Sequence, residues 1–209
     1  MGEGGRGMNI HVFIGMVVQF FFLLTPFFVL SLFVSLTAGM TLKEQRKLAV
    51  RTTLAILIIV VILYLLGDRI FGYLGITLDA FRIGAGLVLL LSGIEVVRSS
   101  GTPSGTRQCD DDGDVAVVPL AIPYTVGPGT IGTLLTMGAS AESAAIRISH
   151  LAGILIAVFM MGALLYFSAT LERLLKKKGL NILSKLTGLF LAALASQLIF
   201  TGIRNMLFG

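Results

Sequence analysis

Two short stretches of the chain combine prolines, glycines and hydroxyl side chains inside long apolar segments. One surrounds Pro26, and the other runs from Pro123 to Thr133 around Pro128. A proline inside a helix removes a hydrogen-bond donor and clashes with the preceding turn, so each stretch predicts a broken helix. The break exposes N–H groups at the start of one half-helix and C=O groups at the end of the other. Such N–H groups attract a carboxylate and the C=O groups can receive an ammonium group, which together suit a zwitterion.

The candidate binding residues are therefore the backbone at the two breaks and the hydroxyl side chains around it. Glycines at the second break would let a ligand approach the backbone closely. The full set is Thr25, Pro26, Ser31, Ser35, Pro123, Tyr124, Thr125, Gly127, Pro128, Gly129, Thr130 and Thr133. The alternative is that these residues serve ordinary packing between membrane helices. Two breaks at equivalent positions favour the binding site over this alternative.

Two polar side chains within apolar segments are candidates for a coupling role. Glu95 could carry a proton, or it could form an interfacial ion pair with Arg98 one turn on. Gln19, in the first half of the first apolar segment, could line a cavity. His150 has no second histidine or carboxylate at metal spacing, so we predict a hydrogen-bonded packing role or an interfacial position. Asp79 and Asn181 are predicted to be helix N-caps.

The sequence contains no nucleophile elbow, zinc-ligand pair, phosphate loop or nucleotide-binding motif. We therefore predict that the protein is not an enzyme and has no cofactor or metal site. The acidic run at 110–114 lacks the ligand spacing of a calcium loop and is interpreted as a solvated linker. The net charge of +5 lies in short loops without a basic stripe interleaved with aromatics, so we predict no nucleic-acid partner.

The composition predicts a helical protein of the lipid bilayer. Of the 209 residues, 56% are hydrophobic and only 13% charged, whereas a soluble domain carries about 25% charged residues. Mean hydropathy is +0.95. Six apolar segments have about the length of a spanning helix. They cover residues 10–38, 47–67, 80–98, 115–139, 145–170 and 182–207, with loops predicted at 43–47, 67–69 and 176–179.

The two halves of the chain match each other at a constant offset of 102 residues. Pro26 falls on Pro128, Tyr64 on Tyr166 and Gly86 on Gly188. Each half holds three segments, an odd number, so the second half must enter the bilayer in the opposite orientation. The predicted fold is all-α, with six transmembrane segments in a 3+3 inverted-topology repeat and broken helices in segments 1 and 4. The predicted divisions are a disordered tail (1–8), a first repeat (9–98), a polar linker (99–114) and a second repeat (115–209).

Lys and Arg are distributed unequally between the two predicted sides. The side with the first, third and fifth loops carries eleven of them and the other side five. The positive-inside bias places the richer side in the cytoplasm, so both termini are predicted to be extracytoplasmic in a multi-pass protein of the cell (inner or plasma) membrane.

At its broken segments the chain resembles the MarC-like (UPF0056) membrane proteins, which include small neutral amino acid transporters. The resemblance rests on Thr25-Pro26-Phe-Phe-Val-Leu-Ser-Leu, on Pro119-Leu-Ala-Ile-Pro123 and on Gly127-Pro-Gly-Thr-Ile131, and it extends over nearly the whole chain from Met8. It implies alternating-access transport of glycine, alanine and similar amino acids, with protons or sodium as candidate coupling ions. Family members commonly have an Asp-Pro pair followed by a second proline where this chain has Thr25-Pro26, so an ion-binding aspartate is not carried over.

Two other functions stay open at this point. One is export of another small metabolite or drug by the same kind of transporter. The other is a channel or a membrane protein that transports nothing. The expected partners are small neutral amino acids and membrane lipid, and the residues do not fix the oligomeric state, the preferred amino acid or the direction of transport.

Overall fold

The computed structural model describes residues 10–98, 125–141 and 143–208, and every regular element within these ranges is a helix. The helices are α1 (Ile10–Leu23), α2 (Pro26–Leu36), α3 (Leu42–Leu74), α4 (Leu78–Arg98), α5 (Pro128–Ala139), α6 (Ala144–Tyr166) and α7 (Ser168–Phe208). Five stretches are long and apolar enough to cross a membrane, at 10–36, 42–67, 78–98, 144–166 and 178–208. The chain is thus an all-helical, multi-pass membrane protein. The predicted segment 115–139 lies partly outside the described residues, and α5 is its second part.

The break predicted in the first segment is confirmed. α1 ends at Leu23 and α2 begins at Pro26, and between them Thr25 has left-handed backbone angles (φ 49°, ψ 52°). Left-handed backbone is unfavourable for a β-branched residue, so the surrounding packing must hold it. Pro26 occupies the first helical position, where no N–H is needed. Pro128 takes the same position in α5, after an extended Gly127.

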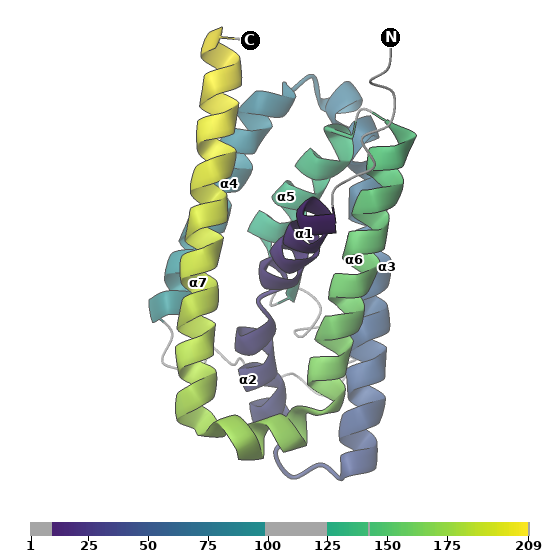
Figure 1. The fold of residues 1–209 in the computed structure, drawn as a ribbon, viewed down its shortest axis with the longest axis vertical. Helices are drawn as coiled ribbons and strands as arrows, with labels where there is room; N and C mark the ends of the chain where they lie inside the picture. Colours follow the sequence, from purple (N-terminus) through teal and green to yellow (C-terminus); the bar gives the residue numbers. More distant parts are fainter. Residues whose placement is uncertain (1–9, 99–124, 142, 209) are drawn as a thin grey trace.

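All three predicted loops are wrong. Residues 43–47 are helical, because α3 begins at Leu42. Residues 67–69 lie inside α3, which continues to Leu74 and ends at Gly75 with φ 63°. Residues 176–179 lie inside α7, and the break between α6 and α7 falls at Phe167 instead. Charged residues mark where a helix leaves the hydrocarbon, but Lys and Arg are good helix formers and do not end it. In Figure 1, α7 accordingly runs across the lower end of the bundle before turning up along it.

The two predicted N-caps are wrong as well. Asp79 lies within the first turn of α4, and the Thr77 hydroxyl instead accepts from the Ala80 N–H at 3.3 Å. Asn181 lies inside α7, and its Oδ1 is buried without a hydrogen-bond partner. Helix starts were placed too late in the sequence at both positions, because α4 and α7 begin before their most apolar residues.

Asp79 joins three parts of the chain at the upper end. Its Oδ1 accepts from Arg82 at 2.7 Å and from Asn205 of α7 at 3.1 Å. Arg82 also donates to the Ser140 hydroxyl, just after α5, at 3.0 Å. The carboxylate therefore connects α4 directly to α7 and, through Arg82, to the end of α5.

We expect Asp79→Ala to lower the stability of the purified protein by about 1–2 kcal/mol. The change removes two hydrogen bonds to a charged acceptor, but Asp79 is partly exposed, so the effect is smaller than for a buried pair. Thermal unfolding in detergent measures it. The exposed Glu95, on the same helix, provides the control Glu95→Ala, which should leave the melting temperature nearly unchanged.

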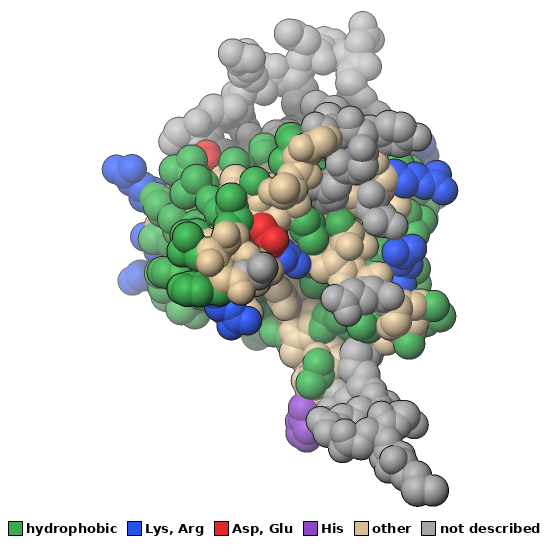
Figure 2. All heavy atoms as spheres, turned by 90° about the horizontal axis from the view of Figure 1, so that it is seen from above, with side chains coloured by type: hydrophobic (Ala, Val, Ile, Leu, Met, Phe, Trp, Pro, Cys, Tyr) green, Lys and Arg blue, Asp and Glu red, His purple; other side chains and the backbone are tan. Residues whose placement is uncertain are grey.

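The helices pack as antiparallel partners. α4 and α7 form the most extensive helix–helix contact, α3 lies against α6, and α5 is enclosed between α3 and α4. α1 packs on α6 and α2 on α7. Figure 1 shows α3 rising where α6 descends, and α4 descending where α7 rises. Large apolar side chains face outward, for example Phe159 (78% exposed) and Leu91 (66%), as expected for a surface that lipid covers. Viewed from above, the described surface carries many hydrophobic and few acidic side chains (Figure 2).

Glycines permit the close contact between α4 and α7, and they do so reciprocally. A Cβ added to Gly86 would lie 2.9 Å from the carbonyl oxygen of Ala195, and one added to Gly188 would lie 2.7 Å from that of Gly93. Gly86 and Gly188 are separated by the repeat offset, and so are Gly93 and Ala195. Gly86 thus meets Ala195, and its repeat equivalent Gly188 meets Gly93, the repeat equivalent of Ala195. This is the pattern expected of two antiparallel helices related by a two-fold axis.

Candidate functional site

The start of α5 meets the end of α1 in the interior of the protein, next to the break before α2. The Thr130 hydroxyl, in the first turn of α5, donates to the carbonyl oxygen of Leu23, the last residue of α1, at 3.2 Å. Both residues are buried. The Leu23 carbonyl is one of the four at a helix end that lack an intrahelical partner. Thr130, from the second predicted break, thus donates a hydrogen bond to a carbonyl group that has no partner within α1 because the helix ends at the first break.

The other predicted hydroxyls divide into two groups. Thr25 and Thr125 are buried close to the breaks, and Thr133 is buried one turn into α5, where its hydroxyl donates to the Gly129 carbonyl at 2.9 Å. Ser31 is half-buried on α2. Ser35 is exposed, donates to the Ser31 carbonyl at 3.0 Å and lies away from the meeting point. Pro123 and Tyr124 lie outside the described residues.

The two coupling candidates, Gln19 and Glu95, lie on different helices, and only Gln19 is close to the breaks. Gln19 is half-buried on α1, one turn before Leu23. Glu95 is exposed near the end of α4, and so is Arg98. The structure therefore brings only Gln19 near the meeting point of the breaks.

Glycines in the first turns of α5 fit it tightly against α4. A Cβ on Gly129 would lie 2.6 Å from the Cα of Leu89, and one on Gly132 would lie 2.5 Å from the Cβ of Ala85. In this conformation Gly129 permits helix packing and leaves no space for a ligand on that side. Gly127, just before the helix, is half-buried.

A void of about 10 Å³ lies beside the breaks, lined by apolar side chains that include Leu23, Leu24 and Leu134. About 10–15 Å³ is needed for one water on the same measure. The described part of the site is therefore closed in this conformation. A ligand larger than a water would require α5 to move away from α1 and α2.

A buried tyrosine of α3 and a half-buried histidine of α6 form a pair beside Phe20 of α1. The Tyr64 hydroxyl and Nδ1 of His150 are 3.0 Å apart, and the His150 ring contacts both Tyr64 and Phe20 edge-on. The hydrogen-bonded packing role predicted for His150 is confirmed. Tyr64 was noticed in the sequence only as a repeat match, and its spacing gave no sign of this partner 86 residues away.

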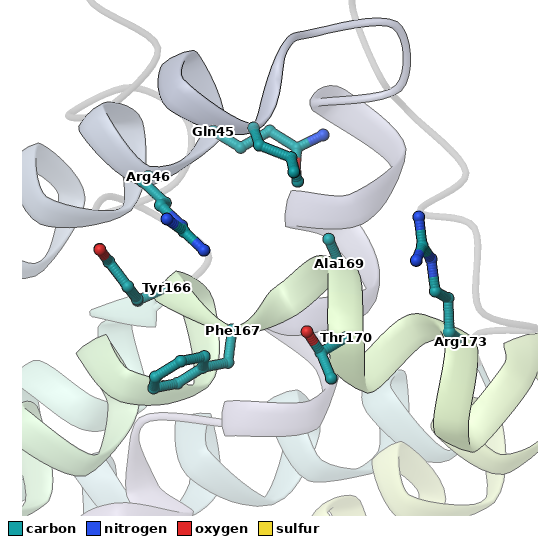
Figure 3. Close-up of a pocket in the computed structure, with 8 residues that line it drawn as sticks. Gln45, Arg46, Tyr166, Phe167, Ala169, Thr170 and Arg173 are labelled. Carbon is teal, nitrogen blue, oxygen red and sulfur yellow. The ribbon is translucent and has the colours of Figure 1, made fainter.

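Sequence reasoning missed a larger cavity, of about 90 Å³, at the lower end of the bundle (Figure 3). None of the predicted site residues lines it. Its walls include Arg46 and Arg173, which had been counted only as indicators of membrane topology. Because these residues come from helices far apart in sequence, their proximity is not visible in the chain alone.

Replacing Thr130 with valine should cost about 1–3 kcal/mol of stability. The change keeps the shape of the side chain but leaves the buried Leu23 carbonyl without its donor. Thr133→Val is the matched control, since the Thr133 hydroxyl donates only to its own helix, and it should cost less than about 1 kcal/mol. Thermal melting of both variants in the same detergent tests the difference. Equal melting temperatures would show that the contact between the breaks contributes nothing.

Comparison with known proteins agrees with the resemblance. The sequence model of a family described as MarC family integral membrane protein matches residues 10–207. A UPF0056 membrane protein of Methanocaldococcus jannaschii is 30% identical, over 96% of this chain and 100% of its own length. The UPF0056 inner membrane protein YhgN of Escherichia coli is 29% identical over 94% and 98%, and the UPF0056 membrane protein YhcE of the same organism is 28% identical over 93% of each chain. No solved structure matches the chain.

Proposed function

This chain belongs to the MarC family of integral membrane proteins, and from that premise we propose that it is a secondary transporter of small neutral amino acids such as glycine and alanine. The observation that carries the proposal is the hydrogen bond from Thr130 to the Leu23 carbonyl, which joins the start of α5 to the end of α1 in the interior. It brings a helix C-terminus and a helix N-terminus together, the two ends that suit the ammonium and carboxylate groups of a zwitterion.

The proposed binding mode uses backbone groups that the closed conformation already pairs. In an open state the Leu23 carbonyl, released by Thr130, would accept from the substrate ammonium group. The first N–H groups of α5, after Gly127 and Pro128, would donate to the carboxylate. Thr25 and Thr125, both buried close by, would provide further hydroxyl contacts. Because apolar side chains such as Leu24 and Leu134 line the adjoining void, only a small neutral side chain would fit.

We further propose that alternating access uses a 3+3 inverted repeat. Three observations support it. α2 and α5 both begin at prolines separated by the repeat offset, and α3 and α6 begin at Leu42 and Ala144, which have the same separation. α3 and α6 are antiparallel, as are α4 and α7 (Figure 1). The contacts of Gly86 and Gly188 are reciprocal. In transporters of this kind one repeat rocks against the other around a fixed site.

The proposed orientation places the lower end of the bundle in the cytoplasm of a cell-membrane protein. The first turns of α3 and α7 lie there and carry many of the Lys and Arg residues (Lys43, Arg46, Lys47, Arg51, Arg173 and Lys178). The beginning of α1 and the end of α7 would then both be extracytoplasmic. A proton or sodium ion would supply the coupling, and Gln19, one turn before Leu23, is the nearer of the two coupling candidates.

The first test is thermal melting of the detergent-purified protein with a panel of amino acids at two pH values. A ligand that binds only the folded state raises the melting temperature by mass action. We expect glycine and alanine to raise it at millimolar concentration, and phenylalanine, glutamate and lysine to leave it unchanged. Thr133→Val should keep the response and Thr130→Val should alter it.

Uptake of labelled glycine into proteoliposomes completes the test. A carrier saturates with substrate and exchanges labelled for unlabelled glycine, whereas a channel conducts without saturating. If no amino acid stabilises the protein and no glycine enters, the proposal is wrong, and the same melting assay with other metabolites and drugs becomes the next experiment.

A further inference from the structure

The cavity at the lower end of the bundle lies outside the proposed transport site. It is formed between the start of α3 and the junction of α6 and α7, and its volume is about 90 Å³. Since one water needs about 10–15 Å³ on this measure, the cavity has room for a group as large as several waters. Its polar lining comes from Gln45, Arg46, Tyr166, Thr170 and Arg173 (Figure 3).

Both arginines in the lining are available to an anion. The Arg46 guanidinium lies 5.0 Å from the centre of the Tyr166 ring, a contact that orients it without neutralising it. In the described part of the chain neither Arg46 nor Arg173 forms an ion pair. The acidic residue nearest to Arg46 in sequence, Glu44, is occupied as a helix cap, since Oε2 accepts from the Thr41 N–H at 2.8 Å and from its hydroxyl at 2.7 Å. Glu172, next to Arg173, forms no ion pair within the described residues.

The remaining polar groups hold the cavity in shape. The Gln45 side-chain nitrogen is 3.3 Å from the carbonyls of both Thr37 and Met40, so it ties the start of α3 to the end of α2. Thr170 lies in the first turn of α7, where its N–H donates to the Phe167 carbonyl at 3.0 Å. Its hydroxyl lines the cavity. The cavity thus has two positively charged side chains, Arg46 and Arg173, and the neutral Thr170 hydroxyl in its lining, and all three residues lie near the beginning of a helix.

The surroundings of the cavity are those of a membrane interface. Exposed apolar side chains flank it, with Leu42 56% exposed, Phe167 55% and Leu174 76%. These side chains would face lipid beside the charged groups. Further exposed cations, Lys43, Lys47, Arg51 and Lys178, lie on the same two helices and give this end a positive field.

We propose that this cavity binds a phosphate group and that an anionic phospholipid of the adjoining leaflet supplies it. Arginine matches phosphate oxygens with paired N–H donors, and the cavity has one arginine on each side, from different helices (Figure 3). Basic pockets between membrane helices on the cytoplasmic side bind anionic head groups in this way. The exposed Phe167 and Leu174 would contact the acyl chains. The bound lipid would hold α3 to the α6–α7 junction.

The test uses the full-length protein in a neutral detergent and follows its melting temperature during titration. The probes are short-chain phosphatidylglycerol, phosphatidylcholine of the same chain length, and sodium phosphate against sodium chloride of equal ionic strength. The variant is Arg46→Gln with Arg173→Gln. The matched control is Arg51→Gln with Lys178→Gln, which removes two exposed charges from the same helices outside the cavity.

We expect phosphatidylglycerol to stabilise the unaltered protein and phosphatidylcholine to have little effect. The cavity variant should need about tenfold or more phosphatidylglycerol for the same shift, because it loses charge-assisted hydrogen bonds from both arginines. The control should stay within about twofold. Arg46→Lys with Arg173→Lys keeps both charges but loses the paired donors, so its affinity should fall between the two.

Three results would overturn the proposal or part of it. An equal loss in the control variant would mean that diffuse charge attracts the lipid. Equal stabilisation by phosphatidylcholine would mean that the acyl chains alone are recognised. Stabilisation by sodium phosphate that the cavity variant abolishes, with no effect of phosphatidylglycerol, would retain the phosphate site but reject the lipid as its source.

Discussion

Replacing Gly138 with alanine should remove most of the folded protein. A Cβ at this position would lie 2.1 Å from the carbonyl oxygen of Tyr64 on α3, far inside van der Waals contact. The obstacle is helix backbone, so no side-chain rotation relieves it, and α5 would have to move away from α3. Gly67, on the facing helix, has the same constraint, with its Cβ position 2.3 Å from the Leu135 carbonyl.

Overpacking costs about 1–3 kcal/mol where side chains can adjust and more where backbone must shift, so we expect at least about 3 kcal/mol here. Size-exclusion profiles and thermal melting of detergent extracts would measure the loss. Gly15→Ala is the control, because a Cβ there meets nothing within 4 Å, and alanine in a helix is favoured over glycine by up to about 1 kcal/mol. A Gly138→Ala protein that melts like the unaltered one would show that α3 and α5 are not packed as described.

The second large effect concerns the contact between α4 and α7. Gly86→Ala and Gly188→Ala should each destabilise the protein by about 1–3 kcal/mol, and by equal amounts. Each added methyl would meet a carbonyl of the other helix, at 2.9 Å and 2.7 Å respectively. Equal effects follow from the reciprocal contacts and would not be expected of two unrelated positions.

The two substitutions should also be additive. Gly188 meets Gly93, which lies about two helical turns from Gly86 on α4, and the two glycines meet different residues. The double variant should therefore lose the sum of the two single effects within about 0.5 kcal/mol. Gly84→Ala on α4, which meets nothing within 4 Å, is the control and should be neutral or stabilising. Unequal single effects beyond the experimental error would argue against an internal two-fold relation.

Sequence alone predicted the helical membrane fold and the break at Pro26, and it predicted a break in the region where α5 begins at Pro128. These features follow from local chemistry, because a proline is tolerated in the first turn of a helix and disruptive further in. The family resemblance was confirmed too. In contrast, the ends of α3 and α7 were misplaced, since a charged run signals the membrane boundary and leaves the helix intact.

The sequence could not predict that the candidate binding site is closed by helix packing. The glycine at 129 was interpreted as a place for a ligand to approach, whereas it lies against Leu89 of α4. The Thr130–Leu23 bond and the arginine cavity depend on contacts between residues about 100 or more positions apart. Such contacts are set by how the helices pack together, which neither periodicity nor spacing along a single chain reveals.

The shortness of α5 has a consequence for how the protein is made. With 12 residues, three of them threonines, α5 is shorter than the roughly 20 apolar residues that cross a bilayer, and it forms the second part of the apolar segment 115–139. α5 packs mainly against α3 and α4, which leave the ribosome before it. We therefore expect α5 to enter the membrane late, by docking onto helices already inserted there. A rearranged gene that places α5 ahead of α3 and α4 should yield inserted chains in which α5 itself stays outside the bilayer.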